Sequence, residues 1–312
     1  MSLFLRSLLL SFCLICFSVE VSSAHAATVV IVSSERSPAY VSAAEAVISE
    51  LERNGVSRYD VLQLTADEWS TAGPLAPKLF VALGSAAASA LAKSVTAAPV
   101  LCTLLPRSSY ERILQASGRK SSSQFSALYL DQPLSRQLEL IRLALPEVHR
   151  IGVLWGPESQ SQASALKTLA HARGLELVEA SVGPDALLFP GLKGVLDSAE
   201  VLLAMADPQV YNSGSIQNIL LASFRAKVPM VAFSPAYVRA GALLALHVTP
   251  TQLGQQAGAI GWGVLQNKAM SASPLYSRDF SVAVNEYVAR SLGLTLDGAA
   301  LRERLLRREG SP

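Results

Sequence analysis

The stretch VALGSAAASALAKSVTAAPVL, residues 81–101, decides the fold of this 312-residue chain. It begins in an apolar run that ends at Leu83, turns at Gly84-Ser85, continues as an alanine-rich helical pattern and reaches a second apolar run after Pro99. Apolar runs joined by helical segments are typical of a parallel β-sheet with helices on both faces. The stretch therefore predicts an α/β sheet whose strands lead through short turns into helices.

The same order of apolar runs and helical patterns occurs twice along the chain. The first cycle contains TVVIVSS at 28–34 and LFVAL at 79–83, and the second contains IGVLW at 151–155 and VLLAMA at 201–206. Two cycles of this kind favour two separate sheets in one chain. We therefore predict two Rossmann-like, doubly wound lobes with a cleft between them that can close on a small molecule.

Three strand-like segments are expected to carry the chain between the lobes. They are the run ending at Leu130, the apolar run 241–248 and the run 279–284. We expect lobe one to comprise residues 27–126, completed by about 249–278, and lobe two to comprise residues 127–248. The lobe that holds the C-terminal strand and helices, 279–312, stays open.

The first 26 residues have the pattern of a secretory signal peptide. Arg6 precedes the apolar run 8–17, and Ala24-His25-Ala26 has the small-x-small pattern of a signal-peptidase site. The apolar run is too short to span a bilayer comfortably, and a retained membrane anchor is the alternative interpretation. We expect cleavage after Ala26 and a periplasmic mature chain that does not insert into the membrane.

The composition narrows the classes of partner. Half of the residues are hydrophobic, only 6% are aromatic and the formal net charge is +2, which argues against a nucleic-acid partner. Cys102 is the one cysteine after the predicted cleavage site, in an apolar run where a buried, inert thiol is expected. We expect a monomer that binds a small molecule.

Motifs for catalysis, metal binding and cofactor binding are missing from the sequence. There is no G-x-S-x-G, no H-E-x-x-H and no P-loop. Gly258, Gly261 and Gly263 lie within a helical pattern and not after a strand, so they do not form a dinucleotide fingerprint. We therefore predict no catalytic residue, no metal site and no cofactor, and an enzyme is the least favoured hypothesis.

Candidate ligand-binding residues in the first lobe follow from sheet topology, because open α/β sheets bind ligands outside the carboxyl ends of their strands. Gly84, Ser85 and Ala86 follow one strand and open a helix, whose free N–H groups and dipole favour a carboxylate. The alternative is that Ser85 only caps that helix. Ser33 and Ser34 follow the first strand and occupy the equivalent turn.

In the second lobe the same rule selects Asp207, Trp155 and Ser234. Asp207 ends a very apolar strand and is expected to meet an amine or hydroxyls of a ligand, or else to form an Asx-turn or a helix cap before Pro208. Trp155 is expected to form an apolar wall of the site or to pack in the core. If Asp207 binds the ligand, Asp207→Ala weakens binding by about tenfold or more without unfolding the protein.

These residues lie in segments that resemble a known family. The segments are VALGSAAASAL, QLELIRLALPEVHRIGVLWGPES, LLAMADPQV, KVPMVAFSPAYVRAGALLALHVTPTQLGQQAG and FSVAVNEYVARSLGL. Their order and spacing resemble the periplasmic substrate-binding proteins of ABC importers, in the tryptophan/tyrosine-type branch. The resemblance implies a type I periplasmic-binding fold with three crossings between lobes. It also implies that Ser85 and Ala86 bind a ligand carboxylate and that Asp207 binds its amine.

One region departs from the family pattern. The family usually has an Asp-Pro pair after the fourth strand, then a glycine-rich stretch and an Asn-x-Thr-Gly. Here these places read Leu105-Pro106-Arg107 and Gln124-Phe125-Ser126-Ala127. The leading hypothesis is an exported solute-binding protein that delivers a small, amino-acid-like molecule to an inner-membrane ABC permease. The alternative is a periplasmic sensor or accessory binding module for a receptor or an outer-membrane uptake system.

Overall fold

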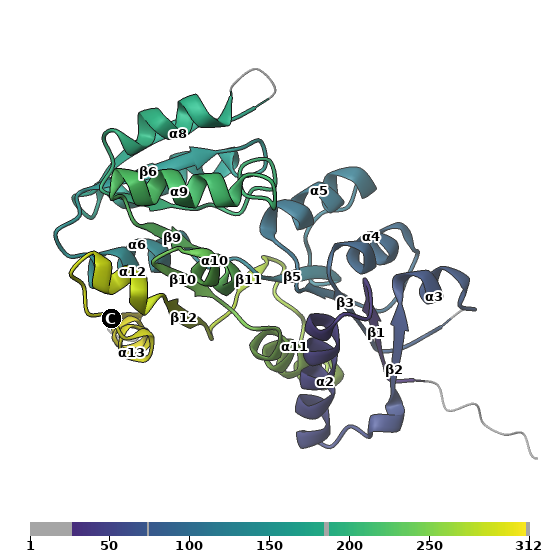
Figure 1. The fold of residues 1–312 in the computed structure, drawn as a ribbon. Coiled ribbons are helices and arrows are strands. Elements are labelled where there is room, and N and C mark those ends of the chain that lie inside the picture. Colours follow the sequence, from purple (N-terminus) through teal and green to yellow (C-terminus); the bar gives the residue numbers. More distant parts are fainter. Residues whose placement is uncertain (1–26, 74, 184–186, 310–312) are drawn as a thin grey trace, which may run out of the picture.

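The computed structural model describes residues 27–73, 75–183 and 187–309 (Figure 1). The predicted signal peptide therefore lies outside the described residues. The chain forms two six-stranded sheets, each with helices on both faces. None of the described helices combines the length and the apolar character that crossing a membrane would require.

The first sheet has the strand order β11-β5-β4-β3-β1-β2, and all neighbouring strands are parallel. Its strands are β1 (Val29–Ser33), β2 (Val61–Thr65), β3 (Leu79–Leu83), β4 (Val100–Thr103), β5 (Phe125–Tyr129) and β11 (Leu275–Tyr276). The helices of this lobe are α2 (Pro38–Arg53), η1 (Arg58–Asp60), α3 (Ala66–Thr71), α4 (Ser85–Lys93), α5 (Arg107–Ser117) and α11 (Pro250–Leu265).

The second sheet has the order β12-β10-β9-β8-β6-β7, and only β12 is antiparallel to its neighbour among the pairings described. Its strands are β6 (Arg150–Trp155), β7 (Glu176–Ser181), β8 (Val201–Leu203), β9 (Met230–Ala232), β10 (Leu244–His247) and β12 (Ser281–Val284). The helices of this lobe are α6 (Leu134–Ala144), η2 (Gln160–Gln162), α7 (Ala163–His171), α8 (Leu188–Leu196), α9 (Ile216–Ala226), α10 (Pro235–Ala240), α12 (Glu286–Ser291) and α13 (Gly298–Glu309).

The two sheets repeat one topology. The order β2-β1-β3-β4-β5 in the first lobe corresponds to β7-β6-β8-β9-β10 in the second. The duplicated cycle in the sequence therefore becomes a duplicated doubly wound sheet, and the predicted α/β fold class is confirmed. In each sheet the strand order reverses beside the first strand of the cycle, which is where such sheets open a crevice for ligands.

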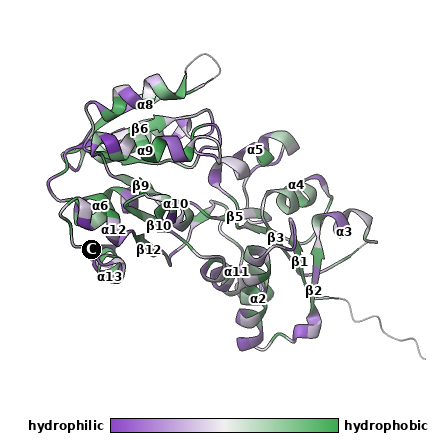
Figure 2. Ribbon diagram, viewed as in Figure 1, coloured by the Kyte–Doolittle hydropathy of each residue, from purple (hydrophilic) through white to green (hydrophobic). Residues whose placement is uncertain are grey.

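Alternating side chains along the buried strands build a core on each face of a sheet. In β1, Val29 and Ile31 pack with α2 and α11, whereas Val30 and Val32 pack in the cluster that contains α4 and α5. Successive side chains of a strand point to opposite faces, so a fully apolar strand needs cover on both sides. Figure 2 shows the apolar residues along the strands and on the inner sides of the helices.

Three crossings join the lobes, as predicted. They are residues 130–133 after β5, 248–249 after β10 and 277–280 between β11 and β12. The expected boundary between residues 126 and 127 falls inside β5, which pairs with β4, so the chain leaves the first sheet only after Tyr129. The C-terminal segment joins the second lobe, because β12 pairs with β10 and α13 packs against β12 and α6.

Candidate functional site

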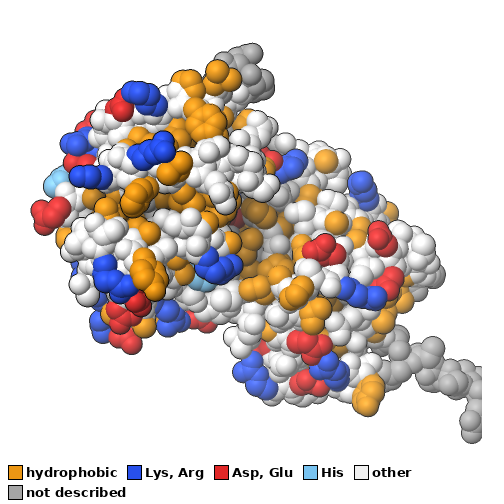
Figure 3. Space-filling view, in the orientation of Figure 1, with side chains coloured by type: hydrophobic (Ala, Val, Ile, Leu, Met, Phe, Trp, Pro, Cys, Tyr) orange, Lys and Arg blue, Asp and Glu red, His pale blue; other side chains and the backbone are white. Residues whose placement is uncertain are grey.

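A cavity lies between the two lobes, at the first crossing. Its volume is about 100 Å³. Its lining residues are Pro106, Leu130, Asp131, Gln132, Gln137, Gln162, Ala204, Met205, Ala206, Phe233 and Leu246. Many of them follow the carboxyl ends of strands in both sheets, whereas Gln137 lies in α6, Gln162 in η2 and Leu246 within β10. Figure 3 shows the hollow between the lobes with apolar side chains in it. A concave, largely apolar site with a few polar groups is typical of small-molecule binding.

The polar part of the cavity comes from the first crossing and the start of α6. Asp131 accepts a hydrogen bond from the backbone N–H of Arg107, with 2.6 Å between nitrogen and Oδ2. Desolvation raises the pKa of the Asp131 carboxyl, while the Arg107 backbone N–H acts in the opposite direction. Gln137 Nε2 donates to the backbone oxygen of Gln132 at 2.9 Å, which fixes the first turn of α6 against the crossing. The cavity thus presents an acid and amides from one short segment.

Of the residues predicted from the first lobe, Ser34, Gly84 and Ala86 lie together at the start of α4. The Ser34 hydroxyl donates to the backbone oxygen of Leu83 and accepts from the N–H groups of Ala86 and Ala87, at 3.0 and 3.1 Å. Ser34 therefore caps α4, and the amide of Ala86 that was predicted for a ligand carboxylate has a partner inside the protein. Ser33 is the last residue of β1 and pairs in register with Leu83.

The turn between β3 and α4 packs closely around Ser34. Gly84 has φ +87°, and a Cβ at this position would lie 2.6 Å from Ser34 Oγ and from the ring of Tyr40. Only glycine adopts this backbone conformation without strain and leaves room for the cap. Ser85 lines a separate groove of the first lobe, between α4 and α5, together with Ser89 and Arg112. The structure thus places Ser85 on a different hollow from the cavity between the lobes.

In the second lobe, Asp207 is 2% exposed and holds a neighbouring loop. Its Oδ2 accepts from the backbone N–H groups of Glu158 and Ser159, each at 2.9 Å, and from Ser159 Oγ at 3.0 Å. Its Oδ1 accepts from the N–H of Gln209 at 3.0 Å. Gly156 lets this loop approach, because a Cβ there would lie within 2.3–2.4 Å of the carboxylate. These contacts match the Asx-turn alternative and tie Asp207 to its own lobe.

The other residues predicted from the second lobe have structural contacts. Trp155 is 2% exposed, packs in the core and donates from Nε1 to Glu179 Oε1 at 2.7 Å. Ser234 is the N-cap of α10 and accepts from the N–H of Ala236 at 3.2 Å. Phe233, directly before it, lines the cavity. The predicted residues thus lie near the carboxyl ends of the strands, but the lining of the cavity between the lobes does not include them.

The lobes also touch beside the cavity. The Ser108 hydroxyl, on α5, donates to Glu158 Oε2 at 3.1 Å, and Arg112 pairs with Glu158 Oε1 at 2.8 Å. Glu158 belongs to the loop that Asp207 holds. Asp207 thus positions a contact between lobes through the loop after β6.

Asp131 and Gln132 line the cavity but are not among the residues predicted from the sequence, which identified their segment only as a crossing. The available signal was a polar pair directly after an apolar strand, at a point where the chain changes lobe. Among residues 27–73, 75–183 and 187–309, no group of three or more metal-ligating side chains gathers. Cys102 is buried, and desolvation raises the pKa of its thiol, so it is an unreactive core residue.

Comparison with known proteins gives related sequences and folds. A curated relative, the tyrosine-binding protein of Clostridioides difficile (strain R20291), is 23% identical over 165 residues. The aligned region is 52% of this chain and 47% of that protein, so the chain spans about half the length of this curated relative.

Two solved structures share the fold. A ligand-free, open substrate-binding protein with adhesive properties from Clostridium difficile has a TM-score of 0.69 and 20% identity, over 86% of this chain and 95% of that chain. A domain from Streptococcus pneumonia in complex with L-Trp has a TM-score of 0.61 and 17% identity, over 89% and 98%.

The family follows from a match over most of the chain. Residues 75–306 match the family described as ABC transporter substrate binding protein. This match confirms the resemblance found in the sequence, and it confirms the prediction of a binding protein over an enzyme. The chain belongs to the ABC transporter substrate-binding protein family.

Proposed function

We propose that this chain is an exported solute receptor that binds a small, amino-acid-like molecule between its lobes and delivers it to an inner-membrane ABC permease. The observation that carries the proposal is the cavity lined by both lobes, with Asp131 on an otherwise largely apolar wall. The tyrosine-binding relative and the L-Trp complex of the Streptococcus domain support an amino acid as ligand.

The proposed mechanism is closure of the two lobes on the ligand. Pro106 belongs to the first lobe, and Met205 and Phe233 belong to the second, so a molecule between them contacts both. Such a ligand binds the closed state more tightly and shifts the population toward it. A ligand of about 10–15 heavy atoms at modest ligand efficiency reaches micromolar affinity.

In this proposal Asp131 binds the ammonium group of the ligand, and Met205 and Phe233 contact its side chain. The predicted residues Ser34 and Asp207 act indirectly, by holding the turn before α4 and the loop after β6. Ser33, Gly84, Ala86, Trp155 and Ser234 are assigned to the strands, turns and core of their own lobes, and Ser85 to the separate groove between α4 and α5.

Binding should depend on pH through Asp131. Burial raises its carboxyl pKa, and Arg107 and Glu111 are its charged neighbours. An ammonium group binds only the ionised carboxylate, so affinity should rise with pH through the raised pKa and then level off. Isothermal titration at a series of pH values between 4.5 and 8 tests this dependence. Asp131→Asn should weaken binding by about tenfold or more and remove most of the change of affinity with pH. If Asp131→Asn leaves the pH dependence of affinity unchanged, Asp131 does not bind the ligand.

The ligand itself should be identified by native mass spectrometry of the protein purified from its own periplasm, with mild denaturation to release bound molecules. A stoichiometric amino-acid-like mass is the expected result. Titration with a library of L-amino acids then gives the affinity. A protein that releases nothing and binds nothing in the library would contradict the proposal, and binding without permease-dependent uptake would favour the sensor hypothesis.

A further inference from the structure

One buried side-chain nitrogen at the cavity has no hydrogen-bond partner among the described residues. Gln132 is 5% exposed and lines the cavity, and its Nε2 atom is without a partner. A buried N–H that is left unpaired destabilises a fold, so such groups are rare and often mark functional sites. The free donor of Gln132 therefore points to an acceptor that the bound molecule supplies.

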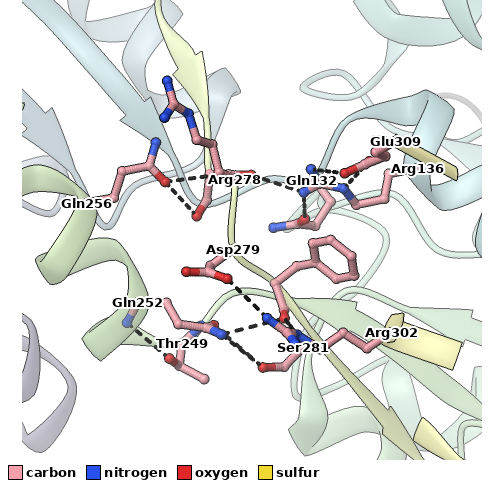
Figure 4. A network of polar contacts seen from close by, with 12 residues as sticks. Gln132, Arg136, Thr249, Gln252, Gln256, Arg278, Asp279, Ser281, Arg302 and Glu309 are labelled. Atoms are coloured by element: carbon pink, nitrogen blue, oxygen red, sulfur yellow. Dashed lines mark hydrogen bonds and ion pairs between the residues drawn. The ribbon is translucent and has the colours of Figure 1, made fainter. Parts of the chain in front are cut away.

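The orientation of this amide is fixed by its neighbour. Gln132 Oε1 accepts from Arg136 NH1 at 2.7 Å. A guanidinium has donors only, so the oxygen of the amide must face Arg136 and the nitrogen must face away from it. Figure 4 shows Gln132 and Arg136 in this arrangement. Without Arg136, the amide would lose the contact that fixes its orientation.

Arg136 is held in place from several sides. It is 6% exposed, and its Nε and NH2 groups donate to the two carboxylate oxygens of Glu309 at 2.6 and 2.9 Å. Its NH1 also donates to the backbone oxygen of Ser277, in the third crossing, at 3.0 Å. The guanidinium lies over the Phe280 ring, 4.3 Å from the centroid. A bidentate ion pair of this kind fixes geometry as well as charge.

We propose that Gln132 Nε2 donates to the carboxylate of an α-amino-acid ligand and that Arg136, held by Glu309, positions this donor. The inference rests on the proposed function and narrows its ligand class. Asp131 and Gln132 are consecutive, so one segment binds both charged groups of the zwitterion. Asp131 binds the ammonium group and the Gln132 amide binds the carboxylate. The C-terminal helix α13 thereby becomes part of the support of the binding site.

Gln132→Glu separates this role from a structural one. Glutamate has the same shape and still accepts from Arg136, so the variant should keep its fold, which circular dichroism checks. The cavity then receives an acceptor in place of a donor, and this acceptor repels a carboxylate. The probes are L-tyrosine and L-tyrosine amide, whose carboxamide N–H can donate to the new oxygen. The affinity ratio of acid to amide should fall by about tenfold or more, measured by isothermal titration.

Glu309→Gln tests the positioning of Arg136. The neutral side chain holds the guanidinium less firmly, so L-tyrosine should bind about threefold to tenfold more weakly, and the acid-to-amide ratio should fall in the same direction. Glu303→Gln is the matched control, because Glu303 is on the same helix, is 67% exposed and lies 4.0 Å from Arg307. The control should change both affinities by less than about twofold.

The result that would overturn this inference differs from the result that would overturn the proposed function. If the wild type binds another amino acid in place of tyrosine, that amino acid and its amide serve as probes. If the wild type binds an amino acid but Gln132→Glu leaves the acid-to-amide ratio unchanged, this inference is overturned and the proposed function stands. A wild type that binds no amino acid overturns both.

Discussion

Replacing Gly254 by alanine is expected to lower the stability of the first lobe by about 3 kcal/mol. Gly254 lies where α11 packs against α2, and an added Cβ would lie 2.3 Å from the backbone oxygen of Ala43 and 2.7 Å from Ala46 Cβ. A backbone atom cannot move aside without moving its helix, so the two helices must separate. Differential scanning calorimetry should show the corresponding fall of about 6–12 °C in melting temperature.

Gly263→Ala is the matched control on the same helix. The nearest atom to a Cβ at Gly263 is Lys268 Cδ at 3.8 Å, an ordinary contact. Alanine forms helices better than glycine by about 1 kcal/mol, so this variant should be as stable as the wild type or slightly more stable. Equal destabilisation by both variants would contradict the close approach of α11 to α2 as the cause, because helix propensity favours alanine at both positions.

Asp207→Ala is expected to destabilise the second lobe by about 3–5 kcal/mol. The substitution removes the acceptor of the four donors of Glu158, Ser159 and Gln209, and it leaves the two donors of Ser159 buried without this carboxylate. From the sequence, the same variant is expected to lose ligand affinity without unfolding. The contacts in the structure predict instead that stability falls first, and chemical denaturation followed by circular dichroism measures it.

Asp197→Ala provides the comparison for Asp207→Ala. Asp197 pairs with Lys193 on the surface and its side chain is 60% exposed, so its loss should change stability by no more than about 0.5 kcal/mol. A wild-type stability for Asp207→Ala together with a large loss of affinity would return Asp207 to the ligand site. That result would also mean that the loop after β6 keeps its shape without the carboxylate.

The elements of the fold could be predicted because their signals are local. The runs at 28–34 and 79–83 contain β1 and β3, and the duplicated cycle gave two sheets of the same strand order. An apolar run that must be buried on both faces has few alternatives to a covered parallel strand. The edge of the sheet where polar residues gather was likewise predictable from Ser34 and Asp207, since a turn after such a strand is where polar side chains can leave the core.

The roles of those polar residues depend on distant partners, which a sequence pattern does not contain. Ser34 accepts hydrogen bonds from the backbone amides of Ala86 and Ala87, and Asp207 accepts one from the backbone amide of Glu158. The requirement for glycine at position 254 likewise comes from a distant partner, because α2 packs against it.

The sequence by itself determined two doubly wound lobes and three crossings, because periodicity and turn residues act over a few positions. Only the tertiary structure decided which side chains line the cavity. Gln132 has its orientation from Arg136, and Arg136 is held by Glu309, 173 positions further along the chain. Contacts over such a distance arise from the packing of the lobes, so they are fixed only when the chain has folded.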